Sequence, residues 1–417
     1  MSRQDSMLAS DSSQKPSRRE FVLGASALAI AYSPVSRALN SQRRSRGKVL
    51  AYVGSDSGAI DGKANGKGIY LFEMDSSSGQ LSLVKLAAEA RNPSWLCLDP
   101  SQRYLYTVNE IADYEGKSGS VSAYAADQSN GDLRLLNTIS SRGAGPAYLS
   151  VDASGKYVFV ANYGGGSIAV FPVLSGGSLG DPTFTHRDED HVGSQKATSA
   201  PPGSFAISGH DAPHAHMIGA DPGNRFVLQT DLGQDRIYVY SFDKETGKLA
   251  PAATPFVSLP SGDGPRHFAF HPNGRWLYSV QEEASTVVFF HFDPATGSMK
   301  AQQTVSSLPD GFAGTSFASG IRVSPDGRTL YAANRLHNSI AVFSIDHTGH
   351  LKHVGDTPTM GDYPPQFNID PSGNFLYVCN QRSDQITSFR IDKRTGLLHF
   401  TGQYTPVGTP TCIIFTS

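Results

Sequence analysis

Two short segments carry side chains suited to acid–base or ester chemistry. His214 and His216 alternate in the segment PHAH, and alternate positions of a strand face the same side. The pair could bind a metal, or one histidine could act as a general base, although no companion ligand motif accompanies them. Arg266 and His267 follow in GPRHFAF, where a guanidinium could stabilise an oxyanion or clamp an anion. The structural alternatives are a hydrogen-bonded histidine pair and a salt bridge.

Further polar side chains come directly after aromatic-rich apolar runs. Glu282 holds such a position and could act as a general base or acid, whereas its neighbour Glu283 is expected at the solvated surface. Glu110 holds the equivalent position earlier in the chain. The pair Asn334–Arg335 follows a third run, and a second arginine would give an anionic ligand two contacts. Because asparagine recurs in this position, we expect it to serve mainly in turns or in lining a channel.

These residues lie at equivalent places in a unit that recurs roughly every 50 residues. The clearest copies span 264–300, 317–354 and 363–400. Each contains an apolar run, a Pro-x-Gly turn, an aromatic-rich run, a polar break and another apolar run. β-Branched and aromatic runs between such turns are typical of strands. A repeat of this length built only from short strands predicts a β-propeller, with functional residues at strand ends around its central channel.

Three rougher copies begin at Pro93, Pro146 and Pro213, which brings the number to six. The stretch 49–83 supplies the later strands of a seventh copy, and 411–415 can supply its missing first strand. Such closure joins both chain ends in one blade and leaves no free sheet edge. We therefore predict an all-β, seven-bladed propeller. A row of separate sandwich domains is disfavoured because no linker divides the repeats.

The N-terminal segment has the pattern of an export signal. Arg18 and Arg19 precede an apolar stretch that is too short to span a membrane as a helix. Twin arginines, a short apolar run and small residues before a break are typical of the twin-arginine route. We expect residues 1–38 to be a signal peptide, 39–48 a disordered lead-in and 49–417 the propeller, located in the periplasm or secreted. A chance arginine pair or an uncleaved anchor is the alternative.

Composition narrows the classes of partner. The formal net charge is −2 at pH 7 and the propeller has no basic block, which argues against nucleic acid. The cysteines Cys97, Cys379 and Cys412 have no metal-ligand spacing and are expected to be small buried groups. Cys97 and Cys412 could pair only if their blades meet. We expect no cofactor, no membrane contact beyond export, and a monomer or weak dimer that acts on a small molecule.

One long segment, 174–211, interrupts the repeats. It holds a run of charged residues and histidines, followed by a stretch rich in serine, proline and glycine. A loop of this length is either a lid or binding loop, or mobile surface. Both interpretations stay open from the sequence.

Several of these segments together resemble a known family. The matching pieces are PHAH at 213–216, DLGQDRIYVYSFD at 231–243, GPRHFAFHPNGRWLY at 264–278, LPDGFAG at 308–314 and VSPDGRTLYAANRLHNSIAVF at 323–343. Their order and spacing resemble the seven-bladed propeller lactonases, which include the propeller-type 6-phosphogluconolactonases and a fungal carboxy-muconate lactonising enzyme. The resemblance covers nearly all of the chain after the export signal.

The resemblance implies a site without metal or cofactor, built from a histidine, two arginines and a glutamate. By position these are His216 or His214, Arg266, Glu282 and Arg335, with His214, His267, Asn334 and Glu110 expected to contact substrate. The implied reaction is hydrolysis of a sugar δ-lactone. Glu282 or His216 would activate water, Arg266 would stabilise the tetrahedral oxyanion, and Arg335 would hold the substrate.

Two positions depart from the family pattern. The sequence has Ser-Gly-Ile-Arg at 319–322 where the family usually has Ala-Glu-Ile-His, and Gly209–His210 where Arg-Gln usually precedes PHAH. Together with the expected export, these departures leave open whether the substrate is phosphorylated. A muconate-type lactonising isomerase and a non-catalytic extracytoplasmic binding propeller are the competing hypotheses, since propellers host many functions.

Overall fold

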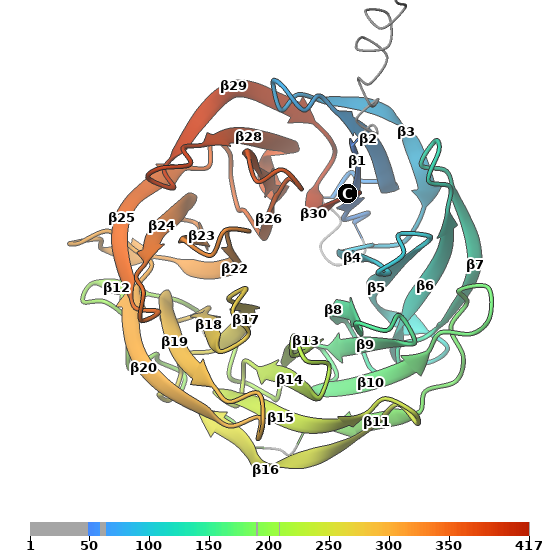
Figure 1. The fold of residues 1–417 in the computed structure, drawn as a ribbon, viewed down its shortest axis with the longest axis horizontal. Coiled ribbons are helices and arrows are strands. Elements are labelled where there is room, and N and C mark those ends of the chain that lie inside the picture. Colours follow the sequence, from blue (N-terminus) through green and yellow to red (C-terminus); the bar gives the residue numbers. More distant parts are fainter. Residues whose placement is uncertain (1–48, 59–63, 189–190, 208, 417) are drawn as a thin grey trace, which may run out of the picture. The chain divides into compact units, whose positions relative to one another are not determined.

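The computed structural model describes residues 49–58, 64–188, 191–207 and 209–416. The predicted signal peptide and lead-in lie outside these residues. One compact unit runs from Lys48 to Ser417. In it, seven four-stranded antiparallel sheets stand around a central channel (Figure 1). The predicted all-β, seven-bladed propeller is confirmed.

In each of the seven blades, the first strand named lines the channel and the last strand named is outermost. Blade 1 contains β30 (Pro410–Phe415), β1 (Val49–Ser55), β2 (Gly68–Met74) and β3 (Leu81–Glu89). Blade 2 contains β4 (Trp95–Leu98), β5 (Tyr104–Tyr114), β6 (Ser118–Ala126) and β7 (Leu133–Ser140), and blade 3 contains β8 (Pro146–Val151), β9 (Tyr157–Asn162), β10 (Ser167–Pro172) and β11 (Phe184–Arg187). Blade 4 contains β13 (Ala215–Ala220), β14 (Phe226–Asp231), β15 (Arg236–Asp243) and β16 (Lys248–Ser258), and blade 5 contains β17 (Pro265–Phe270), β18 (Trp276–Gln281), β19 (Thr286–Phe292) and β20 (Met299–Ser306). Blade 6 contains β22 (Phe317–Val323), β23 (Thr329–Arg335), β24 (Ser339–Ile345) and β25 (Leu351–Pro358), and blade 7 contains β26 (Gln366–Ile369), β27 (Phe375–Asn380), β28 (Gln385–Ile391) and β29 (Leu398–Pro406).

The two ends of the propeller meet in blade 1. Strand β30 pairs antiparallel with β1, so that Tyr52 lies opposite Ile414, as the sequence predicted. The backbone amide of Asp56 donates to the carbonyl of Thr409 at 2.9 Å. Closure therefore stabilises the ring and also places the loop after β1 beside the loop before β30.

A buried tyrosine hydroxyl connects neighbouring blades at five junctions. Each comes from the second strand of a blade and donates to a glycine carbonyl in the outer turn of the next blade; the pairs are Tyr52–Gly131, Tyr106–Gly177, Tyr278–Gly349, Tyr331–Gly396 and Tyr377–Gly79, at 2.8–3.1 Å. At Gly349 φ is +92°, and a Cβ would lie 2.3 Å from the Phe289 ring. The repeated glycine thus permits both the turn and the close blade contact.

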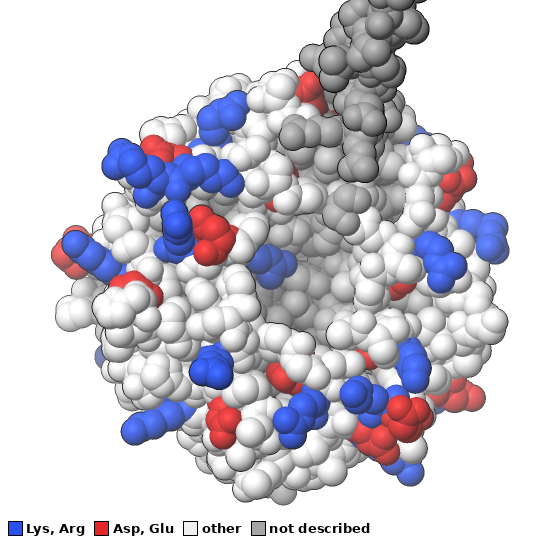
Figure 2. Space-filling view, viewed as in Figure 1, with Lys and Arg blue, Asp and Glu red and all other residues white. Residues whose placement is uncertain are grey.

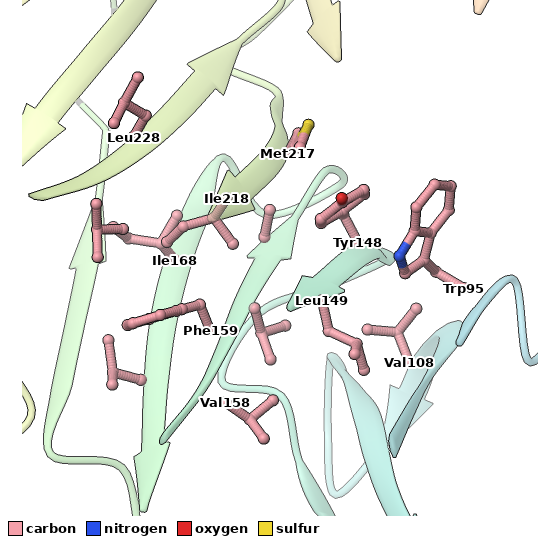
Figure 3. Packing of buried hydrophobic residues seen from close by; sticks show 14 of the residues in the cluster. Trp95, Val108, Tyr148, Leu149, Val158, Phe159, Ile168, Met217, Ile218 and Leu228 are labelled. Carbon is pink, nitrogen blue, oxygen red and sulfur yellow. The ribbon is translucent and has the colours of Figure 1, made fainter. Parts of the chain in front are cut away.

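Apolar side chains fill the space between blades. Leu149, Phe159 and Ile168 of blade 3 interleave with Ile218 and Leu228 of blade 4 (Figure 3), and all of them are buried. Strands buried on both faces need such continuous apolar runs, which explains the short uncharged segments of each repeat. The core therefore holds the channel strands rigidly, and this fixes the positions of the polar side chains at the strand ends.

The long segment 174–211 is only partly an insertion. Its residues Phe184–Arg187 form β11, which pairs with β10 as the outer strand of blade 3. The remainder contains β12 (Ser204–Phe205), which pairs parallel with β21 (Gly314–Thr315). Its Ser199 amide also donates to Asp263 Oδ1 at 3.0 Å. The described part of this segment is thus attached to later blades, and the expectation of an insertion beginning at residue 174 was wrong because β11 completes a blade.

The cysteines are free thiols. Because all three are free, the pair Cys97–Cys412 does not form. Cys379 and Cys412 are buried, and Cys97 is partly exposed. Among the described residues, no helix has the length and apolar character needed to cross a membrane.

Candidate active site

A cavity of about 720 Å³ opens at the channel mouth. Figure 2 shows the ring hollowed at its centre. All seven blades contribute to its lining, which consists of Asp56, Ala64, Asn92, Ser94, Trp95, Glu110, Ala147, Tyr163, His216, Arg266, His267, Glu282, Arg335, Tyr363, Pro365, Gln366, Gln381, Arg382, Asp384, Thr409 and Thr411. The volume is typical of small-molecule sites.

Two arginines converge on one carboxylate oxygen in this cavity. Glu282 Oε2 lies 2.8 Å from Arg266 Nε and 2.7 Å from Arg335 Nη2. The three side chains are almost fully buried, with 9, 9 and 14 % of Arg266, Arg335 and Glu282 exposed. The structure therefore brings together three of the residues that the sequence singled out, from blades 5 and 6.

Arg335 keeps a donor free for a ligand. Its Nε is buried and has no hydrogen-bond partner among the described residues, whereas Arg266 Nε lies against Glu282 Oε2. Burial, and next the charge of Arg335, lowers the pKa of Arg266 to about 10, while Glu282 opposes the shift. Arg266 therefore stays charged at neutral pH. A substrate oxygen that gains negative charge would find two desolvated cations beside it.

Local backbone geometry aims these side chains at the cavity. The pairing of β17 with β18 shifts register between Pro265 and His267, which places Arg266 in a bulge. The pairing of β13 with β14 shifts in the same way between Ala215 and Met217, which places His216 in a bulge. A bulge redirects a side chain that a regular strand would turn elsewhere. The equivalent bulges of blades 4 and 5 thus set the two residues at the channel mouth.

His216 lines the cavity as a neutral imidazole. Its ring is buried, and Nδ1 has no hydrogen-bond partner among the described residues. Burial lowers the pKa of His216 well below 6.5, and the charges of Arg266 and Arg335 add to the shift. The ring therefore carries a free lone pair at neutral pH, which is what a general base requires.

His267 forms part of the cavity floor. Its ring lies 5.0 Å from that of His216 and 5.2 Å from those of Trp95 and Tyr148. Burial lowers its pKa well below 6.5, and Arg266 reinforces the effect. The Arg266 Nη1 atom lies 3.3 Å from His267 Nδ1. We infer that His267 supports Arg266 and closes the channel beneath the site.

Two predicted site residues lie outside the cavity lining. Both ring nitrogens of His214 are engaged, with Nδ1 at 2.9 Å from the Tyr163 carbonyl and Nε2 at 2.9 Å from Asp211 Oδ1. Asn334 is fully buried and exchanges hydrogen bonds with Ser307 at 2.6 and 2.7 Å. The expectation that His214 acts together with His216 on one face was wrong, because β13 begins after His214 and its first pairs are bulged.

Glu110 does reach the cavity, together with residues that the sequence did not indicate. Burial raises the pKa of Glu110 above its usual range, and the charge of Asp56 adds to this rise. Tyr363 also faces the cavity, with φ of 59° and its ring 3.7 Å from the Arg382 guanidinium. Its hydroxyl accepts from Arg335 Nη1 at 3.4 Å. A bulky residue at positive φ is strained, and no sequence pattern signals it.

Glu283 was predicted at the solvated surface, and this is wrong. Only 4 % of the residue is exposed, and the Gly209 amide donates to Oε1 at 2.9 Å. Burial raises the pKa of Glu283 well above its usual range, and the charge of Glu282 raises it further. The segment before β13 covers this carboxyl group, and the repeat pattern of blade 5 alone could not reveal that cover.

Two further buried carboxyl groups lie close together where β11 of blade 3 and β14 of blade 4 end. Asp188 and Asp231 share a hydrogen bond, and burial followed by this contact raises the pKa of Asp188 to about 9. Gln229 Nε2 donates to Asp188 Oδ2 at 2.5 Å, and the His214 amide donates to Asp231 Oδ1 at 3.0 Å. The pair thus joins the end of β11 to the end of β14, the strand that pairs with β13.

We expect Asp188→Asn to make stability less dependent on pH. Between about pH 4 and pH 9 the folded protein keeps a proton on Asp188 that the unfolded chain releases. Through this group, the free energy of unfolding therefore falls as pH rises. Asparagine can donate the same hydrogen bond without taking up a proton. The free energy of unfolding should rise by on the order of 1–2 kcal/mol at pH 8 and stay nearly unchanged at pH 4.5. Thermal melts of both proteins at the two pH values test this, and a melting difference independent of pH would contradict it.

The described residues contain no group of three or more His, Cys, Asp or Glu side chains arranged to hold a metal ion. The two histidines of PHAH have different surroundings. His214 braces Tyr163, on which its ring stacks at 4.2 Å. His216 faces the cavity.

Comparisons with known proteins identify the fold family. Residues 51–415 match the family model described as lactonase, 7-bladed beta-propeller. A 6-phosphogluconolactonase of Bacillus subtilis (strain 168) is 34% identical over 369 residues, covering 88% of this chain and 98% of its own. A 6-phosphogluconolactonase of Formosa agariphila is 33% identical over 351 residues, covering 82% of this chain and 93% of its own. The solved structure of a Pseudomonas aeruginosa periplasmic gluconolactonase has a TM-score of 0.78 and 30% identity, covering 89% of this chain and 99% of its own. The chain belongs to the seven-bladed β-propeller lactonase family.

Proposed function

We propose that the protein hydrolyses a sugar δ-lactone at the channel mouth. One arrangement carries the proposal: Arg266 and Arg335 converge on Glu282 in the cavity that the neutral imidazole of His216 also lines, and His216 Nδ1 has no hydrogen-bond partner among the described residues. Ester hydrolysis needs a base for water and positive charge for the oxyanion. Both are present in one buried cavity, and the lactonase names of the relatives agree with this chemistry.

In the proposed mechanism, His216 Nδ1 takes a proton from a water molecule as the water oxygen attacks the lactone carbonyl carbon. The carbonyl oxygen becomes an oxyanion, which the positive charges of Arg266 and Arg335 and the Arg335 Nε donor stabilise. The intermediate then collapses, and the bond between the carbonyl carbon and the ring oxygen breaks. The imidazolium returns its proton to the departing alkoxide, which yields the open hydroxy acid and restores His216.

Glu282 acts in this mechanism as the residue that orients both arginines. Its Oε2 contacts both guanidinium groups, at 2.8 and 2.7 Å, and is therefore occupied by them. The sequence left Glu282 and His216 as alternative bases. The free lone pair of His216 favours the histidine.

The test is lactone hydrolysis by the full chain, followed as proton release in a pH-stat. We expect δ-gluconolactone to be hydrolysed well above its spontaneous rate, in the presence of EDTA as well as without it. A rate equal to the spontaneous one, from protein that melts cooperatively, would contradict the proposal. The tyrosine hydroxyl contacts between blades make such a melt a suitable check that the ring is intact.

A further inference from the structure

We propose that the substrate is an unphosphorylated polyhydroxy lactone, and that Asp56, Glu110 and Asp384 exclude a phosphorylated one. The inference rests on the proposed function and deepens it, because it assigns a substrate class and specificity residues to the same cavity. These three carboxylates line the same cavity as the catalytic residues. They come from blades 1, 2 and 7, whereas His216, Arg266 and Arg335 come from blades 4 to 6.

The three carboxylates form a wall of hydrogen-bond acceptors. Asp384 receives donors from neutral groups, the Thr409 amide and Asn65 Nδ2, both at 2.8 Å. Asp56 Oδ1 accepts from the Gly58 amide at 2.9 Å. Among the described residues, no cation forms an ion pair with these side chains. No guanidinium or ammonium group therefore holds these oxygens, and each side chain keeps lone pairs for the hydroxyl groups of a sugar.

Hydroxyl-bearing and amide side chains continue this wall. Ser94, Asn92, Thr409 and Thr411 also line the cavity, and Ser94 hydrogen-bonds to Glu110. Hydroxyl and amide groups can both donate and accept hydrogen bonds. A ligand rich in hydroxyl groups would therefore find donors as well as acceptors on this wall.

The charge balance of the cavity opposes a dianion. The described lining carries four carboxylates, Asp56, Glu110, Glu282 and Asp384, against three guanidinium groups, Arg266, Arg335 and Arg382. Two of the arginines already share Glu282, and Arg382 lies flat on the Tyr363 ring. A phosphoryl group near the wall would therefore meet net repulsion. A dicarboxylate of the muconate class would meet the same repulsion.

The pKa of Glu110 reflects the neighbouring charges. Burial is the main cause of its rise and the charge of Asp56 raises it further, whereas a hydrogen bond to Ser94 and the charge of Arg266 lower it. The wall thus already holds carboxylates close enough to repel one another. Further negative charge from a substrate would add to that repulsion.

The experiment compares kcat/KM for δ-gluconolactone and 6-phospho-δ-gluconolactone with the full chain at one pH and ionic strength. We expect the unphosphorylated lactone to be preferred at least about 10-fold, and Asp384→Asn to reduce this preference roughly 5-fold by removing one unit of repulsion. Asp181→Asn is the matched control. It also removes one negative charge, but its side chain is 97% exposed and lies outside the cavity lining, so the preference should stay unchanged.

Two results would overturn the inference. One is a wild-type preference for the phosphorylated lactone. The other is a selective loss of activity on that lactone in Arg382→Ala, because this would identify Arg382 as a phosphate anchor.

The inference stays testable if neither lactone is hydrolysed and the proposed function fails. Calorimetric binding of gluconate and 6-phosphogluconate then provides the same comparison without catalysis. Tighter binding of gluconate supports the acidic wall. Tighter binding of 6-phosphogluconate, or binding of neither acid, overturns it.

Discussion

Replacing Arg266 with alanine should lower kcat for δ-gluconolactone by about 10²–10³-fold, the usual cost of removing one oxyanion donor. Its Nε lies 2.8 Å from Glu282 Oε2, and the buried guanidinium places positive charge beside the position that the oxyanion would take. Alanine removes the charge and also leaves Glu282 with Arg335 as its remaining partner. Initial rates from proton release, corrected for spontaneous hydrolysis, measure the effect.

Two variants separate the role of Arg266 from a general loss of positive charge. Arg266→Lys keeps the charge but not the planar fork of donors, so we expect an intermediate rate. Arg225→Ala removes an exposed arginine that contacts the carbonyls of Pro294 and Ala295 at 3.2 Å, and it should leave kcat unchanged. A folded Arg266→Ala protein that keeps more than a tenth of the wild-type rate would rule out the proposed oxyanion role.

His216→Gln should lower kcat by about 10²–10⁴-fold, the range for loss of a general base, and should also change the pH profile. The neutral imidazole is the reactive form, and burial together with both arginines lowers its pKa well below 6.5. Protonation therefore removes the base only in more acidic solution. We expect wild-type kcat/KM to stay level from pH 8 to pH 6.5 and to fall below that, and this acid limb should vanish in His216→Gln.

His214→Gln is the matched control for this prediction, because His214 lies two residues away and outside the cavity lining. Its ring bonds to Asp211 and to the Tyr163 carbonyl, so its loss should cost some stability and leave the acid limb in place. An acid limb that persists in His216→Gln but disappears in His214→Gln would reverse the two assignments. A wild-type limb centred above pH 7 would also contradict the neutral buried imidazole.

The repeat pattern was sufficient to predict the architecture. Turns with proline and glycine, and the aromatic-rich runs between them, are local features that each blade encodes in its own sequence. The stretch 49–83 lacked a first strand, and β30 supplies it. Equivalent positions in the repeats also placed Arg266, Glu282 and Arg335 at one end of the channel, where the structure brings them into contact.

Strand alternation was not sufficient to separate His214 from His216. Both hold alternating positions in the sequence, but the bulge at Ala215–Met217 and the start of β13 after His214 place them in different surroundings. Asn334 had the right position in its blade and still faces away from the cavity, because Ser307 of the preceding blade satisfies its amide. A bulge is one unpaired residue in a ladder, and its place depends on both strands of the pair.

The sequence by itself determined the seven blades, their closure and the three residues of the arginine–glutamate contact, because strands, turns and repeat positions are encoded locally. Only the tertiary structure decided which charges share the cavity. Asp56 and Asp384 lie far apart in the chain and meet there because the ring closes between blades 7 and 1. Likewise, the low pKa of His216 and the high pKa of Glu283 arise from burial by other segments and from neighbouring charges, which no single repeat contains.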